Sequence, residues 1–238
     1  MSRIFSDSIF HYTDCEDALV GILEKGFQVK CCKEQFIDPA GHYAYIDIPL
    51  VSFCDIPLNC IQYIIYVGYA VGLTRTWAND NRLAPVSYYL NSKDSFSNQS
   101  MRKAYEEYMN SKTKDSQRIL AYLKPMRKYK DGNYGVKTLS NGKQIVLRRD
   151  NYIEREWRKA YLSRWDQGDY YLNKPSYVTF KIEDVSFIVV PESGERSSII
   201  SRIKELTMVG GRNTSPSGID IESLISKVLT IGEIKKNF

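Results

Sequence analysis

Two glutamates and an arginine occupy alternate positions in the segment IEREWRKAY, residues 153–161. On a β-strand, Glu154, Glu156 and Arg158 would share one face, because successive side chains point to opposite sides. The two carboxylates would lie about 7 Å apart, and the guanidinium would relieve their repulsion. Such a face can hold a ribose with one acid and polarise a reacting group with the other. On a helix, Glu154 and Arg158 would form an ordinary i, i+4 ion pair. The segment alone leaves both interpretations open.

Polar residues at the ends of two apolar segments are further candidates. His11 and Thr13 close the segment IFHYT, just before a helix start whose N–H groups could receive a phosphate. Asp55 follows the apolar segment VSFC, where a loop could present it to a ligand. Each residue also has a structural interpretation. Thr13 could cap the helix, His11 could be a core residue, and Asp55 could cap a turn.

Several common site types are not expected. The chain has five cysteines without a CxxC pair and only two histidines, so a metal site is not predicted. It has no GxSxG, GxxxxGK[ST] or GxGxxG motif, which argues against the corresponding hydrolase and nucleotide sites. A Cys–His nucleophile is also disfavoured, since nothing pairs Cys54 with His42.

From its charge and hydropathy, the chain is expected to be a globular cytoplasmic protein with reduced thiols. The net charge of +5 comes from 33 basic and 28 acidic residues spread along the chain, which is a weak signal for polyanion binding. The N-terminus lacks the apolar run of a signal peptide. The apolar segment 64–73 is too short and too rich in tyrosine to span a membrane, so no membrane contact is expected.

The helices and strands that position these residues are predicted from hydrophobic periodicity and from capping and turn residues. Residues 7–13 predict a buried strand, and TDCEDALVGILEKGF predicts a helix with a Thr13–Glu16 capping box and a C-terminal cap at Gly26. Further strands are expected at Leu50–Cys54, Tyr69–Thr74, Pro85–Leu90, 152–162 and twice within 176–191. Asn141-Gly142 predicts a hairpin turn. Helices are expected within 101–127, at 195–206 and twice at the C-terminus, with loops at 91–100 and 207–218.

This order of elements predicts one α+β domain over 1–238, with a mixed β-sheet core and flanking helices. The chain contains no internal repeat and no linker long enough to separate domains.

A series of segments resembles the bacterial abortive-infection family AbiGi, a group linked with phage resistance and labelled an antitoxin. The segments are IFHYTDCEDALVGILEKGF, PLVSFCDIPL, GYAVGLTRTWANDNRLAPVSYYL, EREWR, FIVVPESGERSSII and ISKVLTIGEIKKNF. The resemblance runs from about residue 8 to the end. The region 91–135 matches little and is expected to be a variable helical insertion.

The start of the chain is more distantly similar to DNA-modifying ADP-ribosyltransferase toxins, which begin with an H-x-T strand followed by a helix. His11-Tyr12-Thr13 and ALVGILEKG fall in those places. This resemblance implies an ADP-ribosyltransferase-like fold and NAD as cofactor. His11 and Thr13 would engage the nicotinamide riboside, and Glu154 or Glu156 would be the catalytic acid, with Glu156 preferred. The central NAD-loop motif of the toxins has no match here.

Other residues complete this hypothetical NAD site. Tyr66 or Tyr69 would supply a stacking ring, with Asp55 and Arg158 as further cofactor contacts. The two tyrosines lie in YIIYVGYAVGL, where core packing is the alternative explanation.

Two classes of function therefore remain. The chain is an NAD-dependent enzyme of phage defence that modifies a nucleic acid or protein, or it is an inactive antitoxin or regulatory partner that binds a cognate toxin. Nucleic-acid binding without chemistry rests only on the basic segments LKPMRKYK and VLRR.

Overall fold

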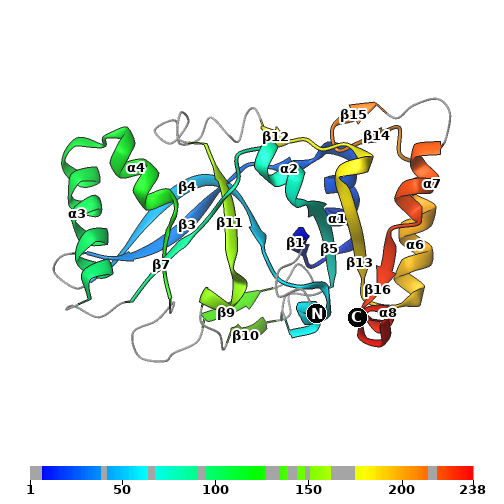
Figure 1. The fold of residues 1–238 in the computed structure, drawn as a ribbon, viewed down its shortest axis with the longest axis horizontal. Coiled ribbons are helices and arrows are strands. Elements are labelled where there is room, and N and C mark those ends of the chain that lie inside the picture. The colour runs from blue at the N-terminus through cyan, green and yellow to red at the C-terminus, as the bar shows by residue number, and fades with distance from the viewer. Residues whose placement is uncertain are drawn as a thin grey trace. The chain divides into compact units, whose positions relative to one another are not determined.

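The computed structural model describes residues 7–38, 42–63, 68–90, 95–126, 135–138, 144–147, 151–161, 175–213 and 219–237. The chain forms two compact units (Figure 1). Unit 1 comprises Met1–Val29, Phe53–Leu83 and Pro175–Phe238, and unit 2 comprises Lys30–Ser52 and Ala84–Lys174. The described elements confirm an α+β protein with a mixed sheet. The single domain over 1–238 and the likeness to ADP-ribosyltransferases stay predictions.

Unit 1 is built on a mixed sheet. Its strands are β1 (Ser8–Thr13), β5 (Tyr69–Thr74), β13 (Val185–Val190) and β16 (Val228–Thr230). β5 pairs antiparallel with both β1 and β13, and β13 pairs parallel with β16. One core cluster of this unit centres on Phe10, Ala70, Val189 and Ile234. Short strands β2 (Phe27–Gln28) and β12 (Tyr177–Val178) form a separate antiparallel pair.

The helices of unit 1 pack beside this sheet. They are α1 (Glu16–Lys25), α2 (Arg75–Asp80), α6 (Ser193–Lys204), α7 (Ile219–Ile225), α8 (Ile231–Asn237), and the 3-10 turns η1 (Leu58–Tyr63) and η4 (Ile182–Asp184). Figure 1 shows α6 and α7 running beside β13 and β16. α1 buries Leu19 and Leu23, and the amide of Gly26 donates to the Ile22 carbonyl.

A β-hairpin that contains two glycines caps the C-terminal end of α1. β14 (Met208–Val209) and β15 (Arg212–Asn213) pair antiparallel around Gly210 and Gly211, which have φ of 59° and 80°. The amide of Gly210 donates to the Leu23 carbonyl at 2.6 Å, and that of Gly211 to the Glu24 carbonyl at 2.8 Å. The last carbonyls of a helix lack partners within the helix. The hairpin therefore supplies the missing hydrogen-bond partners. The prediction of a flexible loop at 207–218 is wrong for the first half of that segment.

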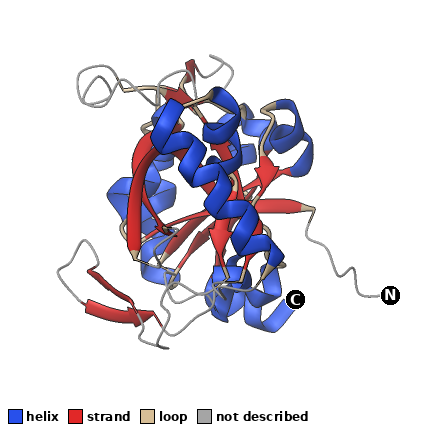
Figure 2. Cartoon of the chain, turned by 90° about the vertical axis from the view of Figure 1, so that its left-hand side faces the viewer, coloured by secondary structure: helices blue, strands red, loops and turns tan. Residues whose placement is uncertain are grey.

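Unit 2 is a sheet with two helices on one face. Its strands β3 (Lys30–Ile37), β4 (Tyr43–Cys54, continuing into unit 1), β11 (Glu156–Ala160) and β6 (Ala84–Pro85) follow one another in that order. The helices are α3 (Phe96–Ser111) and α4 (Lys114–Ala121). Their side chains Met101, Ala104 and Leu120 form a core cluster with Phe36, Ile46, Ile48 and Leu50 of the sheet. Figure 2 shows the helices in front of the strands.

The remaining elements of unit 2 are short. β7 (Ser87–Tyr89) pairs parallel with β8 (Leu123–Pro125), and η2 (Asn151–Glu154) directly precedes β11. β9 (Gly135–Thr138) and β10 (Gln144–Leu147) pair antiparallel, as the Asn141-Gly142 signal predicts, although the turn itself lies outside the described residues.

Several features differ from expectation. The strand expected at Leu50–Cys54 begins at Tyr43, and the strand expected at Pro85–Leu90 is divided into β6 and β7. The strand expected at 152–162 begins only at Glu156, because η2 occupies its first residues and Arg155 adopts a φ of 44°. α3 begins at Phe96, within the expected loop, because the Ser95 hydroxyl caps it by accepting from the Asn98 amide. The Thr13–Glu16 capping box is wrong as well. Thr13 ends β1, and the N-cap of α1 is Cys15.

Candidate functional site

Charged side chains from several segments of unit 2 form a cluster around Glu156. This ion-pair cluster consists of Glu34, Lys124, Glu154, Glu156 and Arg158. Arg158 has no exposed surface and Glu156 is 5 % exposed. The five residues come from four elements: Glu34 from β3, Lys124 from β8, Glu154 from η2, and both Glu156 and Arg158 from β11.

Both carboxylate oxygens of Glu156 bind cations. Its Oε1 accepts from Arg158 Nε at 2.5 Å, and its Oε2 accepts from Lys124 Nζ at 2.5 Å and Arg158 Nη2 at 3.2 Å. Its backbone amide donates to the Tyr88 hydroxyl at 2.8 Å. The side chain is therefore held in one position from two sides.

The two cations of the cluster also reach other partners. Arg158 donates through Nη2 to Glu34 at 2.9 Å and through Nη1 to the Ala121 carbonyl at 3.0 Å. Lys124 Nζ lies 3.3 Å from Glu154 Oε2. The cluster thereby links β3, β8, α4, η2 and β11 beneath the two helices.

Electrostatic interactions keep Glu156, Lys124 and Arg158 ionised. Burial by itself would raise the pKa of Glu156, but Arg158 and Lys124 outweigh it, and the pKa falls to about 2. Burial would lower the pKa of Lys124 and Arg158, but Glu156 and the other carboxylates raise both above their ordinary values. Burial raises the pKa of Tyr88 to about 12. Near neutral pH, Glu156 therefore carries no proton for acid catalysis.

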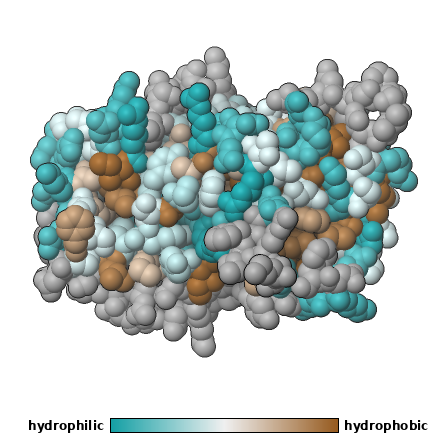
Figure 3. All heavy atoms as spheres, viewed as in Figure 1, coloured by the Kyte–Doolittle hydropathy of each residue, from teal (hydrophilic) through white to brown (hydrophobic). Residues whose placement is uncertain are grey.

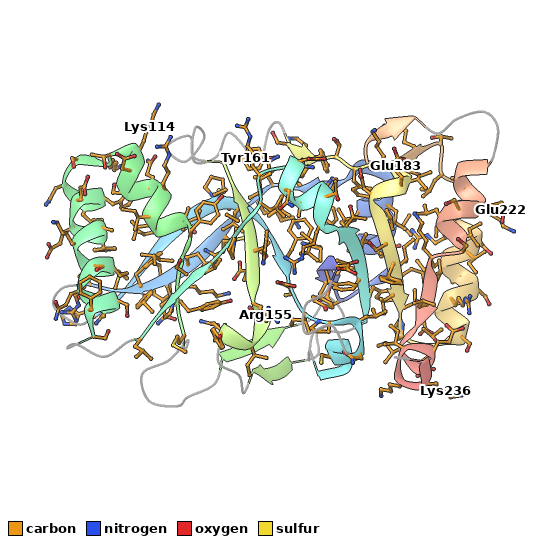
Figure 4. All side chains as sticks on the ribbon, viewed as in Figure 1. Lys114, Arg155, Tyr161, Glu183, Glu222 and Lys236 are labelled. Atoms are coloured by element: carbon orange, nitrogen blue, oxygen red, sulfur yellow. The ribbon has the colours of Figure 1, made fainter. Side chains whose placement is uncertain are left out.

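The predicted shared face is confirmed in part. Glu156 and Arg158 lie on the same face of β11, as alternation requires. Glu154 does not belong to this strand and joins the cluster from η2, through Lys124. Figure 4 places Arg155 at one end of β11 and Tyr161 at the other. The positive φ of Arg155 makes the turn between the acids, which is why they meet without sharing a strand.

The other predicted site residues lie in unit 1. His11, Thr13 and Tyr69 share one face of its sheet, because His11 and Thr13 alternate on β1 and Thr13 pairs opposite Tyr69. The His11 ring packs edge-on against Phe27 at 5.1 Å and Phe53 at 5.6 Å. Burial raises the pKa of Tyr69. The structure thus brings these three together on a face that includes aromatic packing.

Asp55 and Tyr66 complete the predicted set. Asp55 directly follows β4 and is 5 % exposed. Its Oδ1 pairs with Nη2 of Arg75, the first residue of α2, at 2.5 Å. Tyr66 lies outside the described residues.

Two partners of Glu156 were not foreseen from the sequence. Lys124 is 32 residues away from Glu156 in the chain, and Tyr88 is 68 residues away. Glu34 is still further away. No local spacing connects these residues, so only the packing of β3, β8 and β11 reveals the cluster.

The geometry does not fit the expected NAD contact at Glu156. A carboxylate that stabilises the developing charge of a ribosyl cation needs an oxygen turned toward it. Both oxygens of Glu156 already bind Arg158 or Lys124. No reaction step through NAD follows from this arrangement. Among the described residues, no group of three or more His, Cys, Asp or Glu side chains could hold a metal ion.

Comparison with known proteins identifies the family. Residues 26–191 match the family model described as "Putative abortive phage resistance protein AbiGi, antitoxin". The chain belongs to the AbiGi family. No curated protein and no solved structure matches it.

The AbiGi match covers all of unit 2 and only part of unit 1. The ion-pair cluster therefore lies wholly inside the matched range, whereas His11 and Thr13 precede it. The described part of the chain contains no helix that is long and apolar enough to cross a membrane.

Proposed function

We propose that this AbiGi protein acts in abortive infection as an antitoxin that binds and restrains a toxin encoded beside it. The family description supports the class of function, and exposed apolar side chains support a protein partner. Among the described residues, all the exposed large hydrophobic side chains lie in unit 2. They are Tyr45, Leu90, Phe96, Met109, Ile119, Tyr152 and Ile153, at 46–84 % exposure. Over α3 and α4, Figure 3 shows hydrophobic side chains as separate brown patches among hydrophilic ones.

Four of these side chains occur on segments joined by hydrogen bonds, and we call them the apolar surface: Leu90, Phe96, Tyr152 and Ile153. The Met126 amide donates to the Tyr89 carbonyl at 2.8 Å, and the Asn151 amide donates to the Met126 carbonyl at 2.7 Å. These bonds place the end of β7 next to η2. The Ser95 hydroxyl donates to the Leu90 carbonyl at 3.0 Å, which ties the start of α3 to the same place.

The ion-pair cluster gives this surface a rigid base. Lys124 holds Glu154 at the end of η2, while the Asn151 side-chain amide donates to the Pro125 carbonyl at 2.8 Å at its start. The Tyr152 ring packs edge-on against Tyr88 at 5.3 Å. A preorganised surface loses less conformational entropy on binding. We therefore assign Glu156 and Arg158 a supporting role beneath a protein-binding surface.

Co-expression with the product of the adjacent gene tests the proposal. The tagged chain is expected to retain that protein through purification and to elute with it as one complex. The double variant Phe96→Ser/Tyr152→Ser should weaken the complex by roughly 10- to 100-fold, because buried aromatic anchors dominate interface energies. The control Tyr45→Ser removes a ring about as exposed as Tyr152 but outside the apolar surface, and it should leave the complex intact. Failure of the wild-type chain to retain any neighbouring product contradicts the proposal.

The competing hypothesis is NAD-dependent ADP-ribosyl transfer by the same chain. It derives support from the H-x-T resemblance at His11 and Thr13 and requires Glu156 to leave its cations. It predicts that NAD raises the melting temperature, or is consumed, and that Glu156→Gln and His11→Ala each remove this effect. The antitoxin proposal predicts that NAD changes nothing and that Glu156→Gln still binds the toxin once folded.

A further inference from the structure

The sheet of unit 2 has a second face, opposite the helices. Glu34 and Phe36 of β3 point toward the core, because Glu34 binds Arg158 and Phe36 joins the core cluster. Alternation therefore sends Cys31, Lys33 and Gln35 to the other side. Their partners across the antiparallel pair are Pro49, Asp47 and Tyr45 of β4, which share that side.

β11 extends this face. Glu156 and Arg158 are buried on the core side, so Trp157, Lys159 and Tyr161 project to the opposite side, next to β4. The Tyr161 amide donates to the Pro49 carbonyl at 2.9 Å, which connects the end of β11 to β4. Figure 4 shows Tyr161 at this end of the strand. We call the side formed by Lys33, Gln35, Tyr45, Trp157, Lys159 and Tyr161 the open sheet face. Both described α-helices of unit 2 pack on the other side.

The open sheet face combines aromatic rings with cations. Tyr45 is 53 % exposed, and Lys33 Nζ lies 5.3 Å from its ring centroid. Lys159 Nζ lies 5.7 Å from the Tyr161 ring, and Trp157 and Tyr161 are half-buried. Asp47 of β4 lies opposite Lys33 across the strand pair, on the same side of the sheet. Lys33 and Lys159 bring cationic groups to this face, next to its aromatic rings.

A buried amide on the same face lacks a hydrogen-bond partner. Gln35 is 8 % exposed, and its Nε2 has no partner among the described residues. It pairs across the strands with Tyr45. A buried donor left unpaired destabilises a protein, so an acceptor supplied by a ligand beside Tyr45 would be favourable.

We propose that the open sheet face binds single-stranded RNA. Unstacked bases stack on aromatic side chains of exposed sheets, and lysines neutralise the phosphates that run between them. Tyr45 is the exposed stacking ring, Lys33 and Lys159 contact the backbone, and Gln35 donates to a base edge or to a ribose 2′-hydroxyl. The 2′-hydroxyl, which DNA lacks, is why RNA suits the unpaired amide. This site is separate from the apolar surface and does not depend on the antitoxin proposal.

Fluorescence anisotropy with a labelled single-stranded RNA of about 12 nucleotides tests this proposal. The purified full chain should bind it, and two lysine contacts should give a slope of roughly −1.4 in a plot of log affinity against log salt. Tyr45→Ala should weaken binding roughly 5- to 100-fold, whereas Tyr45→Phe should retain it. Lys33→Gln should reduce the slope by about 0.7. Tyr152→Ala, which removes a ring of similar exposure outside the face, is the matched control and should bind as wild type.

Several results would overturn the proposal. One is absence of RNA binding at low salt, and another is equal weakening by Tyr45→Ala and Tyr152→Ala. Equal or tighter binding of the DNA strand of the same sequence would remove the assignment to RNA. If Tyr45→Ala instead releases the co-expressed protein and leaves RNA binding unchanged, the face is a protein interface. Loss of the toxin complex in Phe96→Ser/Tyr152→Ser with RNA binding intact separates the two proposals.

Discussion

Glu156 is held between Arg158 and Lys124 beneath the helices of unit 2, and its ionisation is part of the stability of that unit. Both cations contact it at 2.5 Å, and the side chain is almost fully buried. Removing one partner from a buried ion pair leaves the remaining charges uncompensated. Glu156 therefore contributes more to the stability of the fold than an exposed surface glutamate would.

We predict an acid-dependent loss of stability that originates at this residue. The folded pKa of Glu156, about 2, lies below its unfolded value of 4.5. A lowered folded pKa stabilises the protein fully above pH 4.5, and this contribution is lost as the pH falls from 4.5 toward 2. Urea unfolding across this pH range should show the decline.

The variant Glu156→Gln isolates the effect. It should lower the free energy of unfolding at neutral pH by about 3–5 kcal/mol, because Arg158 and Lys124 lose their shared partner. It should also flatten the acid dependence below pH 4.5. Glu222→Gln changes an exposed acid on α7 and is the matched control. Equal behaviour of the two variants would show that the ion-pair cluster contributes little.

At the scale of elements, the end of α1 depends on a hairpin almost two hundred residues later in the chain. Gly210 and Gly211 donate to the last carbonyls of the helix, and both occupy the left-handed region of backbone conformation. A Cβ atom at position 210 would collide with the carbonyl oxygen and ring of Phe180. Glycine is therefore required there for both conformation and space.

Gly210→Ala should consequently destabilise the protein by about 2 kcal/mol or more. The control is Gly194→Ala on α6, where an added Cβ meets nothing within 4 Å. Alanine in a helix is favoured over glycine by about 0.5–1 kcal/mol, so this control should stabilise slightly. Thermal melts compare the two directly. Similar melting temperatures for both variants would refute the requirement for glycine at position 210.

At the scale of the whole molecule, the two proposed surfaces lie on different segments of unit 2. Hydrogen exchange can therefore distinguish their ligands. The toxin should slow exchange in peptides around Leu90, the first turn of α3 and η2. RNA should slow exchange in β3 and β4 around Lys33 and Tyr45. Protection by the toxin confined to unit 1, for example on α6 and α8, would contradict the antitoxin surface.

Local signals in the sequence determine several elements well. β5 spans Tyr69–Thr74 as predicted, and Gly26 caps the end of α1 as predicted. The apolar stripe of α1 and the continuous apolar run of β5 are patterns of residues close together in the chain. Such local hydrophobic patterns are sufficient to predict both elements. The family also follows from segments of sequence, and the family match confirms it.

Other features depend on contacts that no local pattern contains. The polar segment before Met101 predicts a loop, yet α3 begins at Phe96 once Ser95 caps it and Asn98 and Met101 are buried. The strand expected from Tyr152 starts at Glu156, because Arg155 turns the chain. The glycines at 210 and 211 predict flexibility, but they order a hairpin against α1.

The segment around Glu154 and Glu156 likewise has one property that follows from local sequence and another that depends on tertiary contacts. The sequence by itself determined that two acids and an arginine lie close together, since alternation and short spacing suffice for that. Only the tertiary structure decided their role, because Lys124, Tyr88 and Glu34 arrive from distant strands and bind the charges. The free energy of a buried charge depends on its partners in space, and those partners are set by packing.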